Sequence, residues 1–314
     1  MPGSSPDSFV ASGERESSTR KTQTMALSVA PLTTAVGVEI SGVDLAALTE
    51  AEFAEVERAW HRHSALLFRG QRLSDDDLLS FSRRFGELDP PPNQEQGRMS
   101  PLGYPDIYVV SNVLDEKGRP IGALGAGEAV WHTDMSYLDL PPDASMLYAL
   151  EIPAQGGDTW ICGMQAAWAS LPDGLTDKVR GRRVKHDGTY NSGGHLRQGV
   201  EPTDDPHKAP GAWHPAVCRH PATGAPSLYL GRRRNSFVEG LSPAESEALL
   251  DALWAHIDRP ELRYVHKWRV GDLLLWDNRS TMHRRDPFDA EARRVMHRTQ
   301  IKGRHRPQAY VAAA

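Results

Sequence analysis

The 314-residue sequence has few cysteines, no apolar run of membrane-spanning length and no excess of positive charge. Its two cysteines, Cys162 and Cys218, allow one disulfide but no disulfide framework, which favours a reducing compartment. No apolar stretch reaches the roughly 20 residues of a transmembrane helix, and the first 24 residues hold no signal-type hydrophobic region. A formal net charge of −5 gives no electrostatic basis for binding nucleic acid. We therefore expect a cytoplasmic protein with neither a membrane nor a nucleic-acid partner.

The sequence also lacks a glycine-rich phosphate loop and a dinucleotide-binding fingerprint, which argues against those nucleotide-binding folds. Residues 1–26 are rich in serine and mixed charge, so we expect a disordered N-terminal extension. Apolar residues make up 39% of the chain, enough for a sizeable core. We expect one folded domain over residues 27–305, followed by a C-terminal tail at 306–314.

Local patterns predict many short strands with a few helices. Apolar spacing predicts helices over 48–64, 74–86 and 241–257, the first and third of which begin with capping boxes. Strands are expected within 28–45, at 65–70 and 107–113, and through the C-terminal third at 262–268, 272–278 and 293–301. This pattern indicates a mostly β fold with flanking helices (α+β), either a sandwich or a jelly roll.

Two long stretches rich in Pro, Gly and polar residues, 87–130 and 186–216, interrupt the regular elements. Loops of this length inside a compact domain are often functional. We expect them to act as lids over a site.

The stretch VWHTDMSY (130–137) raises the question of a metal site. If it is extended, His132 and Asp134 point the same way and can supply two ligands to one ion. His283, which follows a buried strand and a turn, is the best candidate for the third ligand. Two imidazoles and one carboxylate on one face suit non-haem Fe(II). The alternative is a polar turn, because the chain has thirteen histidines and an H-x-D triplet often arises by chance.

Two arginines alternate with Met296 near the C-terminus. Arg294, Met296 and Arg298 share one face of a predicted strand, and His297 points the other way. Guanidinium groups that face the interior are costly unless each meets an anion, so an inward pair implies two acids or one shared dianion. The alternative is an edge strand that holds both arginines in solvent.

Taken together, these residues resemble the TauD/TfdA family of Fe(II)- and 2-oxoglutarate-dependent dioxygenases. The resemblance covers residues 27–303, and its motifs occur in order: WHTD (131–134), GGDT (156–159), GDLLLWDNRSTMHR (271–284) and RRVMHR (293–298). The spacing also fits, with 27 residues from His132 to Thr159 and then 11 and 15 from His283 to Arg294 and Arg298. Four ordered motifs are far more specific than any one of them.

The resemblance implies a double-stranded β-helix, which is a jelly-roll variant. It implies that His132, Asp134 and His283 bind Fe(II), and that Thr159 and Arg294 hold the distal carboxylate of 2-oxoglutarate. It directs Arg298 toward the anionic end of the primary substrate. The implied reaction uses O2 to hydroxylate a substrate carbon and releases succinate and CO2. Met135 and Tyr137 follow the ligands and are candidates for lining the substrate pocket, with core packing as the alternative.

The substrate class is narrowed by departures from the taurine branch of the family. Pro91 and Gln94 stand where that branch has a histidine and a tyrosine, and Glu128 stands where it has an asparagine. The C-terminal motif looks closer to the aryloxyalkanoate enzymes, so we expect a small carboxylate or sulfonate, preferably aryloxyalkanoate-like. Taurine, other alkylsulfonates and alkylsulfates remain alternatives, and family resemblance predicts a homo-oligomer. Two other classes are a Zn-dependent hydrolase, which has no use for the Thr159–Arg294 pair, and a non-catalytic anion-binding jelly roll.

Overall fold

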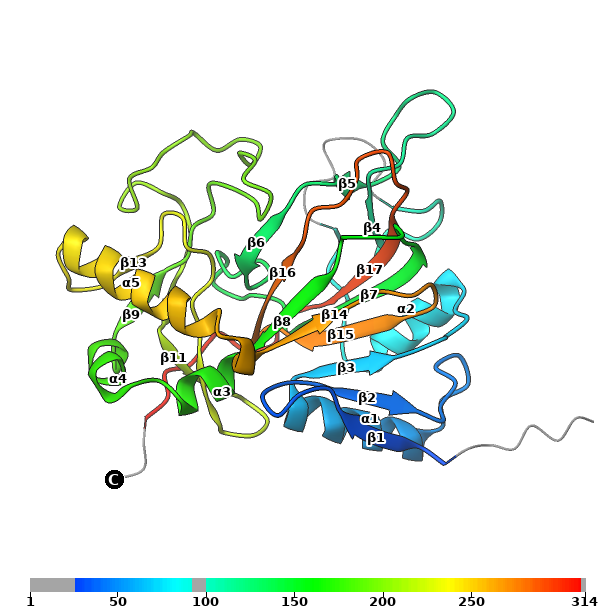
Figure 1. Ribbon diagram of the computed structural model, residues 1–314, viewed down its shortest axis with the longest axis horizontal. Helices are drawn as coiled ribbons and strands as arrows, with labels where there is room; N and C mark the ends of the chain where they lie inside the picture. Colours follow the sequence, from blue (N-terminus) through cyan, green and yellow to red (C-terminus); the bar gives the residue numbers. More distant parts are fainter. Residues whose placement is uncertain (1–25, 92–99, 312–314) are drawn as a thin grey trace, which may run out of the picture.

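The computed structural model describes residues 26–91 and 100–311, and two β-sheets form its centre (Figure 1). The predicted N-terminal extension, apart from residue 26, lies outside the described residues, as does Gln94. The larger sheet has eight strands among the described residues, in the order β1-β2-β3-β15-β7-β17-β4-β5. These strands are β1 (Ser28–Pro31), β2 (Val38–Ser41), β3 (Ala65–Phe68), β15 (Leu273–Asp277), β7 (Ala144–Glu151), β17 (Val295–Ile301), β4 (Tyr108–Ser111) and β5 (Ala123–Leu124).

A second sheet of four described strands faces the larger one, in the order β14-β8-β16-β6. Its strands are β14 (Arg263–His266), β8 (Thr159–Gly163), β16 (Thr281–Arg285) and β6 (Ala129–His132). The two smaller sheets contain β10 (Trp213–Pro215), β9 (Arg183–Lys185), β13 (Phe237–Val238), β11 (Val217–Arg219) and β12 (Pro226–Leu228). The two facing sheets, which are antiparallel apart from the parallel pairs β2–β3 and β4–β5, give the jelly roll that the sequence predicts.

The central strands β3 and β15 are buried on both faces, which explains their continuous apolar sequences. Side chains alternate along each strand, so Leu66 and Leu275 pack into the core beneath the N-terminal helices. Leu67 and Trp276 point the other way, into the core between the two sheets, where they meet Ile161 of β8. This alternation places Trp276 at the wall of a cavity that His132 and His283 also line.

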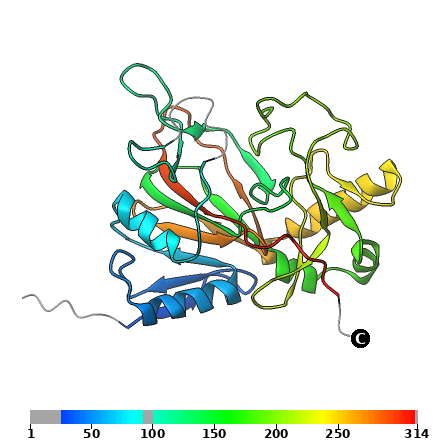
Figure 2. The same cartoon turned by 180° about the vertical axis from the view of Figure 1, so that it is seen from behind.

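Helices α1 (Glu50–His63) and α2 (Asp75–Arg83) cover the outer face of the larger sheet (Figure 2). Both begin with a capping box, and their apolar faces join the same core as β3 and β15. A second core lies around α3 (Met164–Ala169), α4 (Asp173–Val179), α5 (Pro243–Ile257) and η2 (Pro260–Leu262). The three predicted helices are therefore confirmed, whereas α3, α4 and the short strands around them were not predicted.

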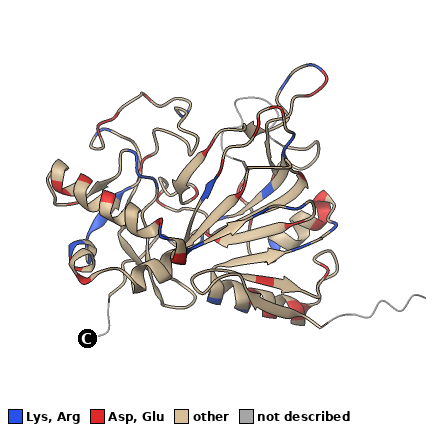
Figure 3. Ribbon diagram, viewed as in Figure 1, with Lys and Arg blue, Asp and Glu red and all other residues tan. Residues whose placement is uncertain are grey.

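Charged residues of both signs are interspersed along the helices and connecting segments (Figure 3). Within residues 26–91 and 100–311, every helix is too short or too polar to cross a membrane. Cys162 and Cys218 are buried free thiols, and burial raises the pKa of Cys162 to about 12.

Candidate active site

The strand pairing brings His132 and His283 together from positions far apart in the sequence. His132 is the last residue of β6 and lies opposite His283 of β16 in the antiparallel register. Their ring centroids are 4.1 Å apart. Asp134 follows two residues after His132, and its Oδ1 lies 3.6 Å from Nε2 of His132 and 3.8 Å from Nε2 of His283. The three predicted ligands therefore direct their donor atoms at one point, all within 4.8 Å of one another.

The segment that carries His132 and Asp134 differs from the extended segment that the sequence predicts. The segment 130–135 is not extended throughout, because β6 ends at His132 and a turn begins at Asp134. Met135 has a positive φ of 46°, which L-residues adopt only rarely. His132 and Asp134 share a cavity because the chain turns there, and strand alternation does not continue past His132.

Hydrogen bonds orient two of the ligands. Nδ1 of His132 lies 2.7 Å from the carbonyl oxygen of Val130. Because a carbonyl only accepts, Nδ1 carries the proton and the lone pair of Nε2 faces the site. Oδ2 of Asp134 accepts from the Ser145 hydroxyl and from Nη2 of Arg298, both at 2.7 Å, so Oδ1 is left for the site.

Burial sets the protonation states of the three groups. It lowers the pKa of His132 and, with His132 adjacent, holds the pKa of His283 well below its usual value. Burial alone would raise the pKa of Asp134, but the neighbouring Arg298 guanidinium holds that pKa well below its ordinary range. At neutral pH the cluster is thus two neutral imidazoles and one carboxylate, the forms that bind a transition metal.

The predicted co-substrate residues lie in the same cavity, whose volume is about 580 Å³. Thr159 is the first residue of β8, and its Oγ1 accepts a hydrogen bond of 3.0 Å from Trp268 Nε1. Arg294 stands just before β17 and is only 2% exposed, yet its Nε and Nη2 atoms have no hydrogen-bond partner among the described residues. Burial, with Arg285 nearby, lowers the pKa of Arg294 to about 9. This guanidinium is therefore placed to receive an anion.

The protein-family comparison decides what kind of molecule this is. The model of the "Taurine catabolism dioxygenase TauD, TfdA family" matches residues 28–300. The chain belongs to the TauD/TfdA family. As a member of that family, it is a 2-oxoglutarate-dependent dioxygenase and hence an oxidoreductase.

Three relatives illustrate the similarity to other TauD/TfdA proteins. The "Alpha-ketoglutarate-dependent 2,4-dichlorophenoxyacetate dioxygenase" of Cupriavidus pinatubonensis is 37% identical, covering 84% of this chain and 93% of that protein. The "(S)-phenoxypropionate/alpha-ketoglutarate-dioxygenase" of Delftia acidovorans is 31% identical, covering 88% and 96%. The crystal structure of AAD-2 in complex with Mn(II) and N-oxalylglycine is 29% identical, with a TM-score of 0.72 and coverage of 91% and 100%.

The TauD/TfdA site also corrects or extends the substrate-side predictions. Met135 lines the cavity, but Tyr137 is not among the cavity-lining residues. Tyr137 is half-buried, and its ring packs against the Arg197 guanidinium, which lies 4.1 Å from the ring centroid. Arg298 lines the cavity, although its Nη2 is bound to Asp134. His297 bonds Asp75 of α2, which agrees with the prediction that it points away from the arginines.

The sequence predictions did not include several residues that line the cavity. Arg197, Arg232 and Arg285 all line the cavity beside the expected Arg294 and Arg298. Sequence inspection finds Arg232 and Arg285 only as members of short basic clusters, and nothing in a cluster says which member turns inward. Ser145, which orients Asp134, is the second residue of β7 and gives no sequence signal of its role.

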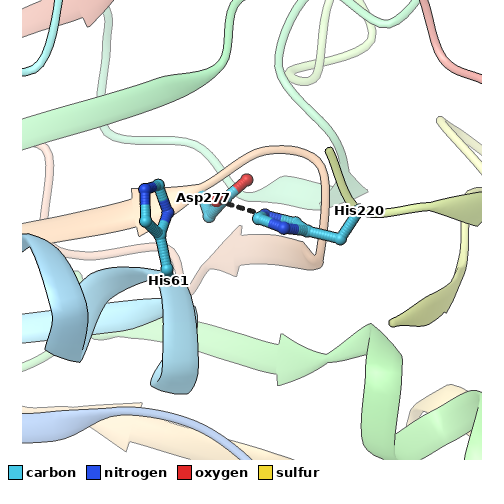
Figure 4. A group of neighbouring side chains, drawn as sticks. All are labelled: His61, His220 and Asp277. Carbon is cyan, nitrogen blue, oxygen red and sulfur yellow. Dashed lines mark hydrogen bonds and ion pairs between the residues drawn. The ribbon is translucent and has the colours of Figure 1, made fainter. Parts of the chain in front are cut away.

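A second group of potential ligands, His61, His220 and Asp277, lies outside the cavity (Figure 4). The Asp277 carboxylate already accepts from Nε2 of His220 at 3.0 Å and from Nε and Nη2 of Arg279 at 2.8 and 2.6 Å. Nδ1 of His220 accepts from the Thr223 amide. Two of the three groups, His220 and Asp277, are therefore already engaged, and a guanidinium neutralises the acid, while Nδ1 of His61 has no partner among the described residues. This network instead fixes the turn between β15 and β16, the strand that carries His283.

Proposed function

We propose that this TauD/TfdA member uses Fe(II), 2-oxoglutarate and O2 to hydroxylate a small anionic organic substrate, with succinate and CO2 as co-products. An aryloxyalkanoate-like carboxylate is favoured. The observation that carries the proposal is the shared cavity, in which a two-histidine, one-carboxylate cluster lies beside the buried Arg294 guanidinium, whose Nε and Nη2 have no hydrogen-bond partner among the described residues.

The donor set fits Fe(II). His132, Asp134 and His283 would hold the ion, since two imidazoles and a carboxylate form the facial set typical of non-haem Fe(II) oxygenases. The donor atoms of the three residues lie within 4.8 Å of one another. Ser145 and Arg298 hold the far oxygen of Asp134, which keeps Oδ1 directed at the ion.

Thr159 and Arg294 would hold the distal carboxylate of 2-oxoglutarate. The free Nε and Nη2 of Arg294 form one edge of the guanidinium, which matches a carboxylate through two parallel hydrogen bonds. The Thr159 hydroxyl, which already accepts from Trp268, has its proton free to donate to the same carboxylate.

When bound, Fe(II) and 2-oxoglutarate supply the O2-dependent oxidation of a C–H bond. The chain's own residues position the reactants and limit water in the site. Trp276, Leu147 and Val110 give the cavity apolar walls suited to an aromatic or alkyl body. Both long loops contribute lining residues, including Leu124 and Leu196, which supports their proposed role as lids.

The substrate assignment rests on the guanidinium groups and the apolar walls of the cavity. It also rests on two relatives whose names are those of aryloxyalkanoate dioxygenases, the phenoxypropionate and 2,4-dichlorophenoxyacetate enzymes. Glu128 lines the cavity at a position where the taurine branch has an asparagine, and this departure disfavours taurine itself. Alkylsulfonates and alkylsulfates with larger apolar bodies remain the second candidate, because a sulfate oxygen fits a guanidinium as well as a carboxylate oxygen does.

Two measurements test the proposal. Under anaerobic conditions, Fe(II) with 2-oxoglutarate should give a weak visible charge-transfer band, whereas Zn(II) should not. Succinate release should then depend on substrate across a panel of aryloxyalkanoates, alkylsulfonates and alkyl sulfates. Absence of both the band and succinate would refute the dioxygenase assignment for these residues.

We also propose that residues 27–305 form one domain and that the protein assembles as a cytoplasmic homo-oligomer. Size-exclusion chromatography with light scattering tests the assembly, and limited proteolysis tests the domain limits. A monomer in the first experiment would contradict the proposed assembly.

A further inference from the structure

Arg232 is the buried cation of the cavity for which the proposed reaction has no role so far. It follows Gly231, whose carbonyl accepts from the amide of Thr133 at 3.3 Å, between the two ligands His132 and Asp134. Gly231 has a φ of +71°, and a Cβ there would lie 2.4 Å from Nδ1 of His186. The Gly231 carbonyl is thus hydrogen-bonded to the segment that carries the ligands, and the close approach of His186 allows only glycine at this position. This fixes the point from which the Arg232 side chain starts.

The Arg232 guanidinium has little to satisfy it. The residue is 6% exposed, and the one hydrogen bond of its guanidinium within the described part of the chain runs from Nη1 to the Tyr190 carbonyl at 3.4 Å. Nε has no partner, and no carboxylate of the described residues forms an ion pair with it. Burial, with Arg197 nearby, lowers the pKa of Arg232 to about 10. A buried cation beside a like charge is costly unless an anion joins them.

Arg197 is the second cation of this group. It lies across the Tyr137 ring, and its Nε is also buried without a partner. The two arginines come from different segments, Arg197 from the long 186–216 loop and Arg232 from the residues after β12. Both line the cavity together with the proposed iron ligands.

The other cavity arginines are engaged through their terminal nitrogens or by the proposed co-substrate, although Nε of Arg285 and Nε of Arg298 also lack a partner among the described residues. Arg298 gives Nη2 to Asp134 and Ser145, which makes it a positioning residue for the metal ligand. Arg285 donates to the carbonyls of Leu124 and Gly127. Arg294 is taken by the proposed co-substrate. Arg232 is therefore the most buried guanidinium that remains for a further anion.

We propose that Arg232, assisted by Arg197, binds the anionic group of the primary substrate, and that Arg298 serves mainly to orient Asp134. This inference rests on the proposed function and names the residues that would bind the anionic group of the primary substrate. The free Nε edge of Arg232 suits a carboxylate or sulfate oxygen pair. The apolar walls then receive the rest of the substrate.

The test measures binding by calorimetry on the full chain with Fe(II) and 2-oxoglutarate under anaerobic conditions. The probes are 2,4-dichlorophenoxyacetate and hexyl sulfate, each compared with a neutral analogue, 2,4-dichlorophenoxyethanol and hexanol. Arg232→Gln should weaken binding of at least one anionic probe more than tenfold, and Arg232→Lys should recover part of the loss. The dissociation constant for 2-oxoglutarate, measured without probe, should change less than twofold. Arg233→Gln is the matched control, because Arg233 is the adjacent residue and pairs with Glu247 and Asp251 at the surface.

A thermal melt separates substrate binding from a structural role. Removing a buried, unsatisfied cation should leave the ligand-free melting temperature of Arg232→Gln unchanged or raised, whereas loss of a structural arginine would lower it. If Arg232→Gln folds poorly, Arg197→Gln provides the second variant, with the same expected loss for the anionic probe alone.

The outcomes are distinguishable. If wild type binds 2-oxoglutarate but Arg232→Gln and Arg197→Gln bind the anionic probes like wild type, this inference is overturned and the proposed function stands. The inference is also overturned if wild type binds neither anion more tightly than its neutral analogue. Failure of wild type to bind 2-oxoglutarate at all would instead overturn the proposed function.

Discussion

Replacing Arg294 with methionine should weaken 2-oxoglutarate binding without destabilising the ligand-free protein. Arg294 is 2% exposed and carries two unpaired nitrogens, so its charge has no compensation until an anion arrives. Methionine fills much of the same space without charge. Truncating one partner of a buried charge pair costs about 2–5 kcal/mol, which corresponds to roughly a 30- to 4,000-fold weaker dissociation constant.

A thermal-shift assay with a fixed Mn(II) concentration measures this effect. At 2-oxoglutarate equal to 100 times the wild-type dissociation constant, binding adds about 2.7 kcal/mol to the unfolding free energy. That gain raises the melting temperature by about 5–11 °C, using about 2–4 °C per kcal/mol for larger domains. A variant weakened about 30-fold keeps only about 0.9 kcal/mol at the same concentration, a shift of about 2–3 °C.

The matched control is Arg293→Met. Arg293 is the preceding residue, but it lies at the surface and pairs with Glu151. This variant should keep the full wild-type shift. The reasoning is refuted if Arg294→Met also keeps the full shift, or if its ligand-free melting temperature falls well below that of Arg293→Met, because Arg294 would then be a structural residue.

Three further perturbations follow from the site and the core. Asp134→Ala should abolish Mn(II) binding, measured by electron paramagnetic resonance, and succinate release, with an unchanged circular dichroism spectrum; retained succinate release would refute the ligand assignment. Ser145→Ala should weaken Mn(II) binding about tenfold because Asp134 loses one of its two anchors; an unchanged dissociation constant would contradict that role. His186 stays neutral when folded because burial, with His214 adjacent, holds its pKa well below 6.5, whereas the unfolded chain protonates near 6.5. The unfolding free energy should therefore fall by up to about 2 kcal/mol between pH 6.5 and 5 through this residue alone. His186→Gln should remove that part of the pH dependence in urea titrations at the two pH values, and an identical loss in both proteins would count against it.

The helices were predictable because their signals are local. In α1, Thr49 and Glu52 satisfy each other's backbone amides at the N-terminus, and the apolar residues that follow recur once per turn. The same chemistry begins α2 and α5. Strand β16 was not predicted as a separate element, because the polarity of its residues alternates too weakly to indicate a strand. Its pairing with β6 and β8 defines it.

The sequence by itself determined which residue types could meet a metal and a carboxylate, because the motifs around His132, Asp134, His283 and Arg294 recur in order at fixed spacing. Tertiary structure alone decided how they meet. Strand register sets His283 against His132, the turn that begins at Asp134 brings the carboxylate toward both imidazoles, and β7 supplies Ser145 to orient that carboxylate. It also decided which arginines face the cavity. Burial and ion pairing depend on neighbours far along the chain, so the sequence alone gives the three arginines at 232–234 as equal candidates for facing the cavity. Packing then buries Arg232 and leaves Arg233 paired at the surface.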